Sequence, residues 1–133
     1  GQRMILGVGI DIVDVTRIEA LRMKYGDRFI ARIFTRGEAL YCESKSTPSL
    51  HLAARFAAKE AAMKALGTGF AEGIKFTDIE VDKDQDQPRI ILHGKAFELS
   101  QKLGVSRIHI SISHDRLYAT SLIILEGDGL SLP

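Results

Sequence analysis

The chain has 133 residues, of which 45% are hydrophobic and 26% are charged, and its formal net charge is +1. This length predicts a single domain spanning residues 1–133, and the near-neutral charge gives no general attraction to nucleic acid. Apolar runs stay well below the roughly 18 residues of a membrane helix, so we expect neither a nucleic-acid nor a membrane partner. The single cysteine, Cys42, and a start unlike a signal peptide indicate the cytoplasm.

The first predicted element is a strand that follows residues 1–3, which we interpret as an expression remnant or a frayed terminus. Up to residue 12, apolar side chains alternate with a face that carries Gly7, Gly9 and Asp11. The glycines leave space for a ligand or another backbone to approach that face. Asp11 is therefore a candidate ligand-binding residue, although an aspartate after a strand more often caps a turn.

Helices are predicted next along the chain. Asp14 is the expected N-cap of a helix of about three turns that ends at Gly26, and a second helix is expected from about residue 36. The polar loop SKSTPS ends in Thr47-Pro48, a pair that favours the start of a helix. This third helix is long and is expected to end near Leu66.

Short strands dominate the rest of the pattern. Extended runs at 75–81 and 88–94 predict a hairpin, a helix follows over 95–103, and two strands are expected at 107–114 and 118–125. The tail, residues 126–133, is expected to be loose. Because strands and helices mix without regular strand–helix–strand alternation, the expected class is α+β, with a largely antiparallel sheet packed with helices including one long helix.

The long helix contains RFAAKEAAMKAL, residues 55–66, and its unusual member is Glu60. This glutamate lies within about 40° of Phe56 and about 60° of Met63 around the helix axis. Lys64 follows four residues later, which is the spacing of an exposed ion pair worth about 0.3 to 0.5 kcal/mol. The alternative is that Glu60, at the margin of an apolar stripe, needs a partner better than water. The sequence favours neither interpretation.

A third cluster is SISHD, where Ser113 and His114 are expected on the polar side of a strand. Such side chains usually form a solvated face, but they also suit the binding of phosphate oxygens. A serine hydrolase is set aside because no G-x-S-x-G turn is present, and Cys42 has no signature of a nucleophile. If the two acids converge, they suit Mg²⁺ with a phosphate-bearing substrate.

Three motifs together, GVGIDIVDVTRIE, RFAAKEAAMKALGTG and SISHD, make the chain similar to the small bacterial-type holo-acyl-carrier-protein synthases of the 4′-phosphopantetheinyl transferase superfamily. The resemblance extends from about residue 4 to about residue 125. It implies the 4′-phosphopantetheinyl transferase fold and Mg²⁺-dependent transfer of 4′-phosphopantetheine from coenzyme A to a serine of apo acyl carrier protein, for fatty acid synthesis. Adenosine 3′,5′-bisphosphate would be released. It also implies a homotrimer with sites at the subunit interfaces.

The same resemblance implies roles for individual residues. Asp11 and Glu60 match the magnesium ligands, and Glu60 and Lys64 are the expected catalytic residues. The expected contacts with coenzyme A are Arg55, Lys64, Ser113 and His114. The base that activates the carrier serine is either Glu60 or a metal-associated water.

On the first helix, Arg17 and Lys24 project within about 20° of each other, with Leu21 about 40° away. A solvated face is the usual fate of such charges. Because the family docks its first helix against an acidic helix of the carrier, the resemblance implies that Arg17, Leu21 and Lys24 bind the carrier protein. Arg28 joins them only if the helix continues through Gly26.

Two other functions stay open at this stage. A metal-dependent phosphohydrolase would use the same two acids but let water attack, and it would release bisphosphate without a carrier. A nonenzymatic nucleotide- or protein-binding module would use these motifs only for packing, so that neutralising Asp11 or Glu60 would leave ligand binding nearly intact.

Overall fold

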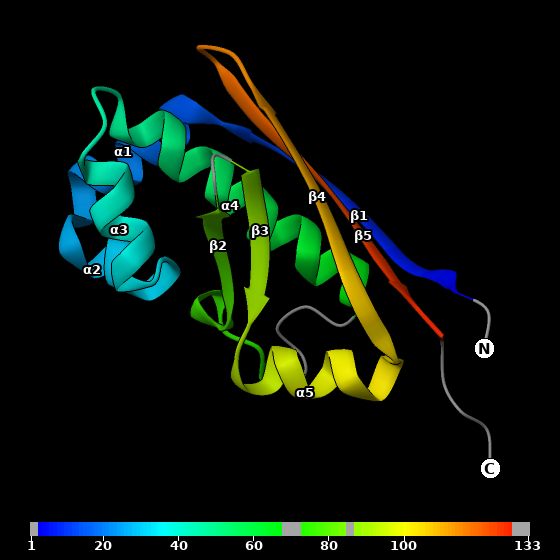
Figure 1. Ribbon diagram of the computed structural model, residues 1–133. Helices are drawn as coiled ribbons and strands as arrows, with labels where there is room; N and C mark the ends of the chain where they lie inside the picture. The colour runs from blue at the N-terminus through cyan, green and yellow to red at the C-terminus, as the bar shows by residue number, and fades with distance from the viewer. Residues whose placement is uncertain (1–2, 68–72, 85–86, 129–133) are drawn as a thin grey trace.

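The computed structural model describes residues 3–67, 73–84 and 87–128 (Figure 1). A three-stranded antiparallel sheet has the order β1-β5-β4, and β2 pairs with β3 in a separate antiparallel hairpin. The strands are β1 (Met4–Asp14), β2 (Ile79–Asp84), β3 (Gln87–Leu92), β4 (Val105–His114) and β5 (Tyr118–Gly127). The helices are α1 (Val15–Tyr25), α2 (Asp27–Ile33), α3 (Arg36–Glu43), α4 (Pro48–Leu66), α5 (Gly94–Leu103) and the 3₁₀ turn η2 (Phe76–Asp78). The expected α+β class is confirmed.

The long helix α4 lies along one face of the three-stranded sheet, with α1, α2 and α3 gathered near its start and α5 near its end (Figure 1). Its contact with β1 is made through backbone atoms. A Cβ added at Gly9 would lie 1.8 Å from the carbonyl oxygen of Ala61, and one added at Gly7 would lie 2.1 Å from that of Ala65. The glycine face of the first strand therefore exists because another backbone occupies the space a side chain would need.

Local signals set the ends of α1 and α4. The Asp14 side chain accepts a hydrogen bond from the Thr16 amide at 2.8 Å, which confirms the expected cap. The helix α4 ends at Gly67, whose φ of 86° is left-handed. Gly26 separates α1 from α2, so Arg28 lies on a different helix and does not extend the strip formed by Arg17 and Lys24.

The prediction of a loose tail is wrong for its first two residues. Glu126 and Gly127 belong to β5, where Gly127 pairs with Met4 of β1 and with Val105 of β4. Glycine is needed there because an added Cβ would lie 2.0 Å from the Gly104 carbonyl oxygen. Residues 129–133, and residues 1–2 of the expected remnant, lie outside the described residues.

A buried ion pair joins α3, α4 and β2. Lys59 is fully buried, and its Nζ lies 2.7 Å from Oε1 of Glu38, which is also buried. The ammonium donates to the Phe76 carbonyl at 3.0 Å and to the Ile79 carbonyl. The amide of Val81 donates to Oε2 of Glu38 at 2.8 Å. Burial lowers the pKa of Lys59, and the Glu38 carboxylate opposes that effect. These bonds fix the hairpin against the two helices.

Among the described residues, no helix is both long and apolar enough to cross a membrane. The buried side chains form two clusters, and α4 contributes to both: its first half packs with α1, α2 and α3, and its second half packs with β5, the hairpin and α5. One helix thus connects the whole described core.

Candidate functional site

The close contact between β1 and α4 brings Asp11 and Lys64 together, although 53 positions separate them. Lys64 Nζ lies 2.9 Å from Asp11 Oδ1 and 3.0 Å from the Ile10 carbonyl oxygen. The aspartate side chain is 18% exposed and the lysine side chain 55% exposed. Lys64 therefore forms its ion pair with Asp11 of β1. The sequence suggests Glu60, four residues earlier on the helix, as its partner.

Glu60 lies one turn before Lys64 on α4 and is half-buried. Burial raises the pKa of Glu60, the nearby charge of Asp11 raises it further, and Lys64 and Arg17 act in the opposite direction. Two carboxylates thus influence each other beside one ammonium group. Such a site favours an added cation, because a cation relieves the repulsion between the acids.

The donor set fits one class of metal. Among the described residues there is no group of three or more histidine, cysteine, aspartate or glutamate side chains that would enclose an ion. Mg²⁺ typically takes one or two carboxylates and completes its shell with water and substrate phosphates. Asp11 and Glu60 match that preference, whereas zinc would need more protein ligands.

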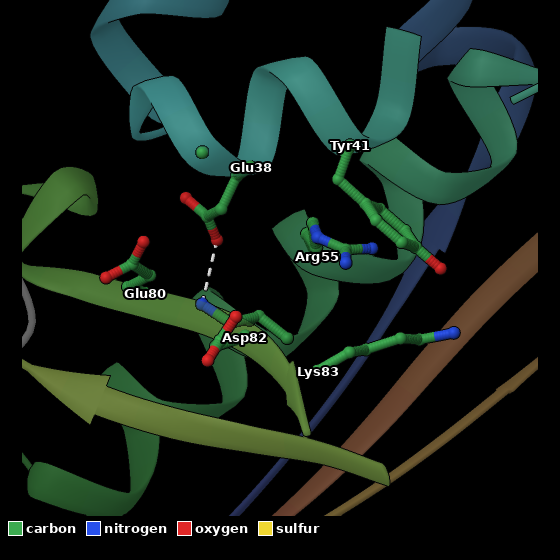
Figure 2. A pocket seen from close by; sticks show the side chains of 8 residues that line it. Glu38, Tyr41, Arg55, Glu80, Asp82 and Lys83 are labelled. Carbon is green, nitrogen blue, oxygen red and sulfur yellow. Dashed lines mark hydrogen bonds between the residues drawn. The ribbon is translucent and has the colours of Figure 1, made fainter. Parts of the chain in front are cut away.

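A cavity of about 400 Å³ lies beside the first half of α4 (Figure 2). The lining residues are Gly37, Glu38, Tyr41, Arg55, Glu80, Val81, Asp82 and Lys83. Arg55 is only 4% exposed, and within the described residues its Nε has no hydrogen-bond partner. A buried guanidinium with an unused donor at a cavity is prepared to bind an anion, since leaving that donor unpaired costs free energy.

More positive groups surround the same place. The Arg55 guanidinium lies 4.3 Å from the centre of the Tyr41 ring, Lys45 Nζ lies 4.6 Å from it, and Lys83 Nζ lies 5.3 Å from it. A hydrogen bond from Lys83 lowers the pKa of Tyr41. We call Arg55, Lys45 and Lys83, together with Tyr41, the cationic cluster. The three cations come from the loop after α3, from α4 and from β2, and they gather positive charge around Tyr41 of α3 in a nearly neutral protein.

The two predicted residues of β4 lie on opposite faces of the sheet. His114 shares the inward face with Ile112 and points toward α4, where its ring lies 6.3 Å from that of His51. Ser113 is exposed on the outer face, opposite Thr120 of β5. Placing both on the polar side was therefore wrong for His114, because successive side chains of a strand alternate.

The residues expected to bind the carrier protein all lie on α1. Arg17 and Lys24 are exposed, Leu21 is half-buried, and Ile18 is fully buried and anchors the helix. The charge of Arg17 reaches Glu60, since it acts to lower the pKa of that carboxyl. Arg17 is therefore the residue of the strip whose charge acts on Glu60.

Sequence reasoning missed Tyr41, Lys45, Lys83, His51 and the buried pair. The one available signal was the spacing of Tyr41 and Lys45, which are four residues apart at the end of a helix and so can contact each other. Lys83 comes from a distant strand. Its approach to Tyr41 depends on the packing of the hairpin and has no local signature.

The model of the 4′-phosphopantetheinyl transferase superfamily matches residues 7–121 of the chain. The chain therefore belongs to this superfamily. Within it, the chain is similar to a protein named holo-[acyl-carrier-protein] synthase from Koribacter versatilis strain Ellin345, with 50% identity over 124 residues that cover 92% of this chain and 99% of the relative.

Solved structures give the same result. A crystal structure of holo-[acyl-carrier-protein] synthase from Neisseria meningitidis superimposes with a TM-score of 0.84 at 34% identity, covering 92% of this chain and 98% of that one. A Helicobacter pylori holo-[acyl-carrier-protein] synthase in complex with coenzyme A gives a TM-score of 0.78 at 31% identity, covering 89% of this chain and 98% of that one. The expected resemblance, the expected fold and the enzyme class are confirmed.

Proposed function

We propose that the protein transfers 4′-phosphopantetheine from coenzyme A to a serine of apo acyl carrier protein and releases adenosine 3′,5′-bisphosphate. The observation that carries this proposal is the contact between Asp11 and Lys64 at 2.9 Å, beside a half-buried Glu60. Together these residues offer two carboxylates for a cation and one ammonium group for phosphate oxygens. Both are what the transfer of a phosphoryl-linked group requires.

Asp11 and Glu60 would hold Mg²⁺, which when bound supplies positive charge to the diphosphate. Lys64 is 55% exposed, so its ammonium group can also reach phosphate oxygens and stabilise the charge on the leaving bisphosphate. The base that accepts the serine proton would be either Glu60 or a metal-associated water.

The cationic cluster would bind the nucleotide part of coenzyme A. Arg55 precedes Glu60 by five residues on α4, which is about 7.5 Å along the helix axis and about 140° around it, so a ligand that reaches both has to be extended, as coenzyme A is. The unpartnered Nε of Arg55 and the cavity of about 400 Å³ support this placement. His114, which faces the start of the same helix, would join the nucleotide contacts.

We further propose a homotrimer with active sites at the subunit interfaces. The outer face of β1 carries a row of exposed apolar side chains, in which Ile5 is 65%, Ile10 61% and Ile12 66% exposed. A row of this kind on a sheet face is typical of a surface that another subunit covers. Ser113 lies on the same outer face, so it would contact coenzyme A bound at a neighbouring subunit.

The proposed location is the cytoplasm, and the proposed pathway is fatty acid synthesis. Residues 1–133 are proposed to act as a single domain, because both buried clusters include parts of α4. Cys42 is buried and in the thiol form, which is compatible with a reducing compartment.

The test of transfer is the mass of apo carrier protein after incubation with this enzyme, coenzyme A and Mg²⁺. We expect a gain of one phosphopantetheine group. Asp11→Asn and Glu60→Gln should each slow transfer at least about a hundredfold, because metal-assisted stabilisation is worth several kcal/mol and about 1.4 kcal/mol is a factor of ten. Glu98→Gln, an exposed change on α5, is the matched control. Addition of EDTA should have the same effect as either variant.

Three outcomes would contradict the proposal in different ways. Bisphosphate release without any carrier protein would identify a phosphohydrolase. Unchanged turnover in well-folded Asp11→Asn or Glu60→Gln would refute the metal assignment. An unmodified carrier with coenzyme A still bound would favour a binding module.

Docking of the carrier is tested by reversing the strip. Arg17→Glu combined with Lys24→Glu should raise KM for the carrier, with little change for coenzyme A, and the difference from wild type should shrink as salt rises. Lys95→Glu with Lys102→Glu is the control, because these exposed lysines have the same seven-residue spacing on α5. An unchanged KM for the carrier would show that the strip is only a solvated surface.

A further inference from the structure

His51 has no role in the function proposed so far, yet it lies between two residues that do. Its ring makes edge-to-face contacts with Tyr41, at 6.1 Å between centroids, and with His114, at 6.3 Å. It also precedes Arg55 by four residues, so the two side chains lie one above the other on the same face of α4. His51 thus connects the cationic cluster to the histidine of β4.

The charged and titratable groups around His51 come from every neighbouring element. They are Tyr41 of α3, Lys45 of the following loop, Arg55 of α4, Lys83 of β2 and His114 of β4. Partial burial lowers the pKa of His51, and Arg55, Lys45, His114 and Lys83 lower it further. The imidazole therefore protonates less readily than an isolated histidine while the cluster has no ligand.

A phosphate dianion reverses this balance. Three oxygens with nearly two negative charges would offset the cations and accept hydrogen bonds from several donors. The unpartnered Nε of the buried Arg55 marks where such a group would bind. A histidine one helical turn away would then gain, by protonating, a charged donor toward the same oxygens.

We propose that His51 is an additional ligand-binding residue, which contacts the terminal phosphomonoester of coenzyme A and takes up a proton as that dianion binds. This phosphate is the one that remains at the 3′ position of the released adenosine 3′,5′-bisphosphate. The inference rests on the proposed function, and it adds a specificity: the enzyme distinguishes coenzyme A from dephospho-coenzyme A through His51.

The direct test is an NMR titration of the histidine ring signals of the full chain. The four histidines are assigned by single glutamine variants, and their pKa values are measured without ligand, with coenzyme A and with dephospho-coenzyme A. We expect the pKa of His51 to rise with coenzyme A and to change little with dephospho-coenzyme A. The ring signals of His109 should not respond to either ligand. Its Nε2 lies 3.1 Å from Glu126 Oε1, and this pair is not part of the cationic cluster.

Calorimetry gives a second measurement at pH 7.5, where the phosphate is already a dianion. Wild type should take up protons when coenzyme A binds, and His51→Gln should take up fewer. Loss of one charge-assisted hydrogen bond should reduce the preference for coenzyme A over dephospho-coenzyme A about tenfold. His109→Gln should keep both the proton uptake and the preference.

The outcomes separate this inference from the function on which it rests. Tight binding of coenzyme A with an unmoved His51 signal would overturn the inference and leave the function intact. An equal rise with both ligands would also overturn it, because the diphosphate would then be the cause. If wild type binds no coenzyme A at all, the proposed function fails together with the inference.

Discussion

Replacement of Lys59 by methionine tests the buried pair. The substitution keeps the length and most of the volume of the side chain but removes the ammonium group. Glu38 would remain buried, with the backbone amides of Thr35 and Val81 as its remaining donors, each at 2.8 Å. The carbonyl oxygens of Phe76 and Ile79 would also lose a donor.

Breaking a buried ion pair by removing one partner costs about 3 to 5 kcal/mol, because a charge is left without compensation. A small domain has only about 5 to 15 kcal/mol of stability, so Lys59→Met should remove a large part of it. With a urea dependence of about 1 to 3 kcal/mol per molar, the midpoint of unfolding should fall by about 2 M.

The assay is urea unfolding followed by circular dichroism, with Lys102→Met as the matched control on the exposed face of α5. Adding Glu38→Gln to Lys59→Met should recover part of the loss, because neutralising the carboxylate removes the unpaired buried charge. A loss of stability below about 1 kcal/mol for Lys59→Met would refute the reasoning, because an exposed ion pair contributes about that much.

Three further predictions concern other parts of the fold. Gly9→Ala should push β1 from α4, because its Cβ would lie 1.8 Å from the Ala61 carbonyl oxygen, and should lower stability by at least about 1 to 3 kcal/mol and slow transfer. If the proposed trimer forms, Ile10→Asp should convert it to monomers in analytical ultracentrifugation while the chain stays folded, since this side chain is 61% exposed. Cys42 should resist iodoacetamide at pH 8, because burial raises the pKa of its thiol to about 11 and only about one thiol in a thousand is then ionised.

Each of these predictions has a control. Gly37→Ala should keep the stability of wild type, because the nearest atom to its added Cβ is a side-chain oxygen of Glu80 at 3.7 Å. Met23→Asp, also on an exposed apolar residue, should leave the assembly unchanged. Cys42 should react once urea unfolds the chain. A stable Gly9→Ala enzyme, a trimeric Ile10→Asp variant or rapid labelling of native Cys42 would contradict the respective argument.

Sequence periodicity predicts most of the fold because strands with one buried face and an alanine-rich helix have strong local signals. It does not predict α2, which has seven residues between Gly26 and Phe34. Such a segment is too short to establish a helical period, and it is stable because Ile33 is buried by tertiary packing.

The candidate site likewise contains residues that the sequence predicts and residues that it does not. Asp11, Glu60 and Lys64 are recognisable because the motifs that contain them resemble those of a known family, whereas the hydrophobic pattern alone leaves Glu60 either in an exposed ion pair or as a ligand. Lys59 is not recognisable, since a lysine on a helix normally lies in solvent and its burial depends on a carboxylate from another helix. The cationic cluster likewise forms only when three separate elements pack around Tyr41.

The direct backbone contact between β1 and α4 has a consequence for how the sequence can vary. Because the strand rests on the carbonyl oxygens of Ala61 and Ala65, side-chain volume does not set the separation of Asp11 from α4. Exchanges among large apolar residues elsewhere can move α1, α2 or α3 and leave that separation unchanged. Gly7 and Gly9, by contrast, admit no larger residue. The positions most restrictive for the chemistry are therefore those with the smallest side chains.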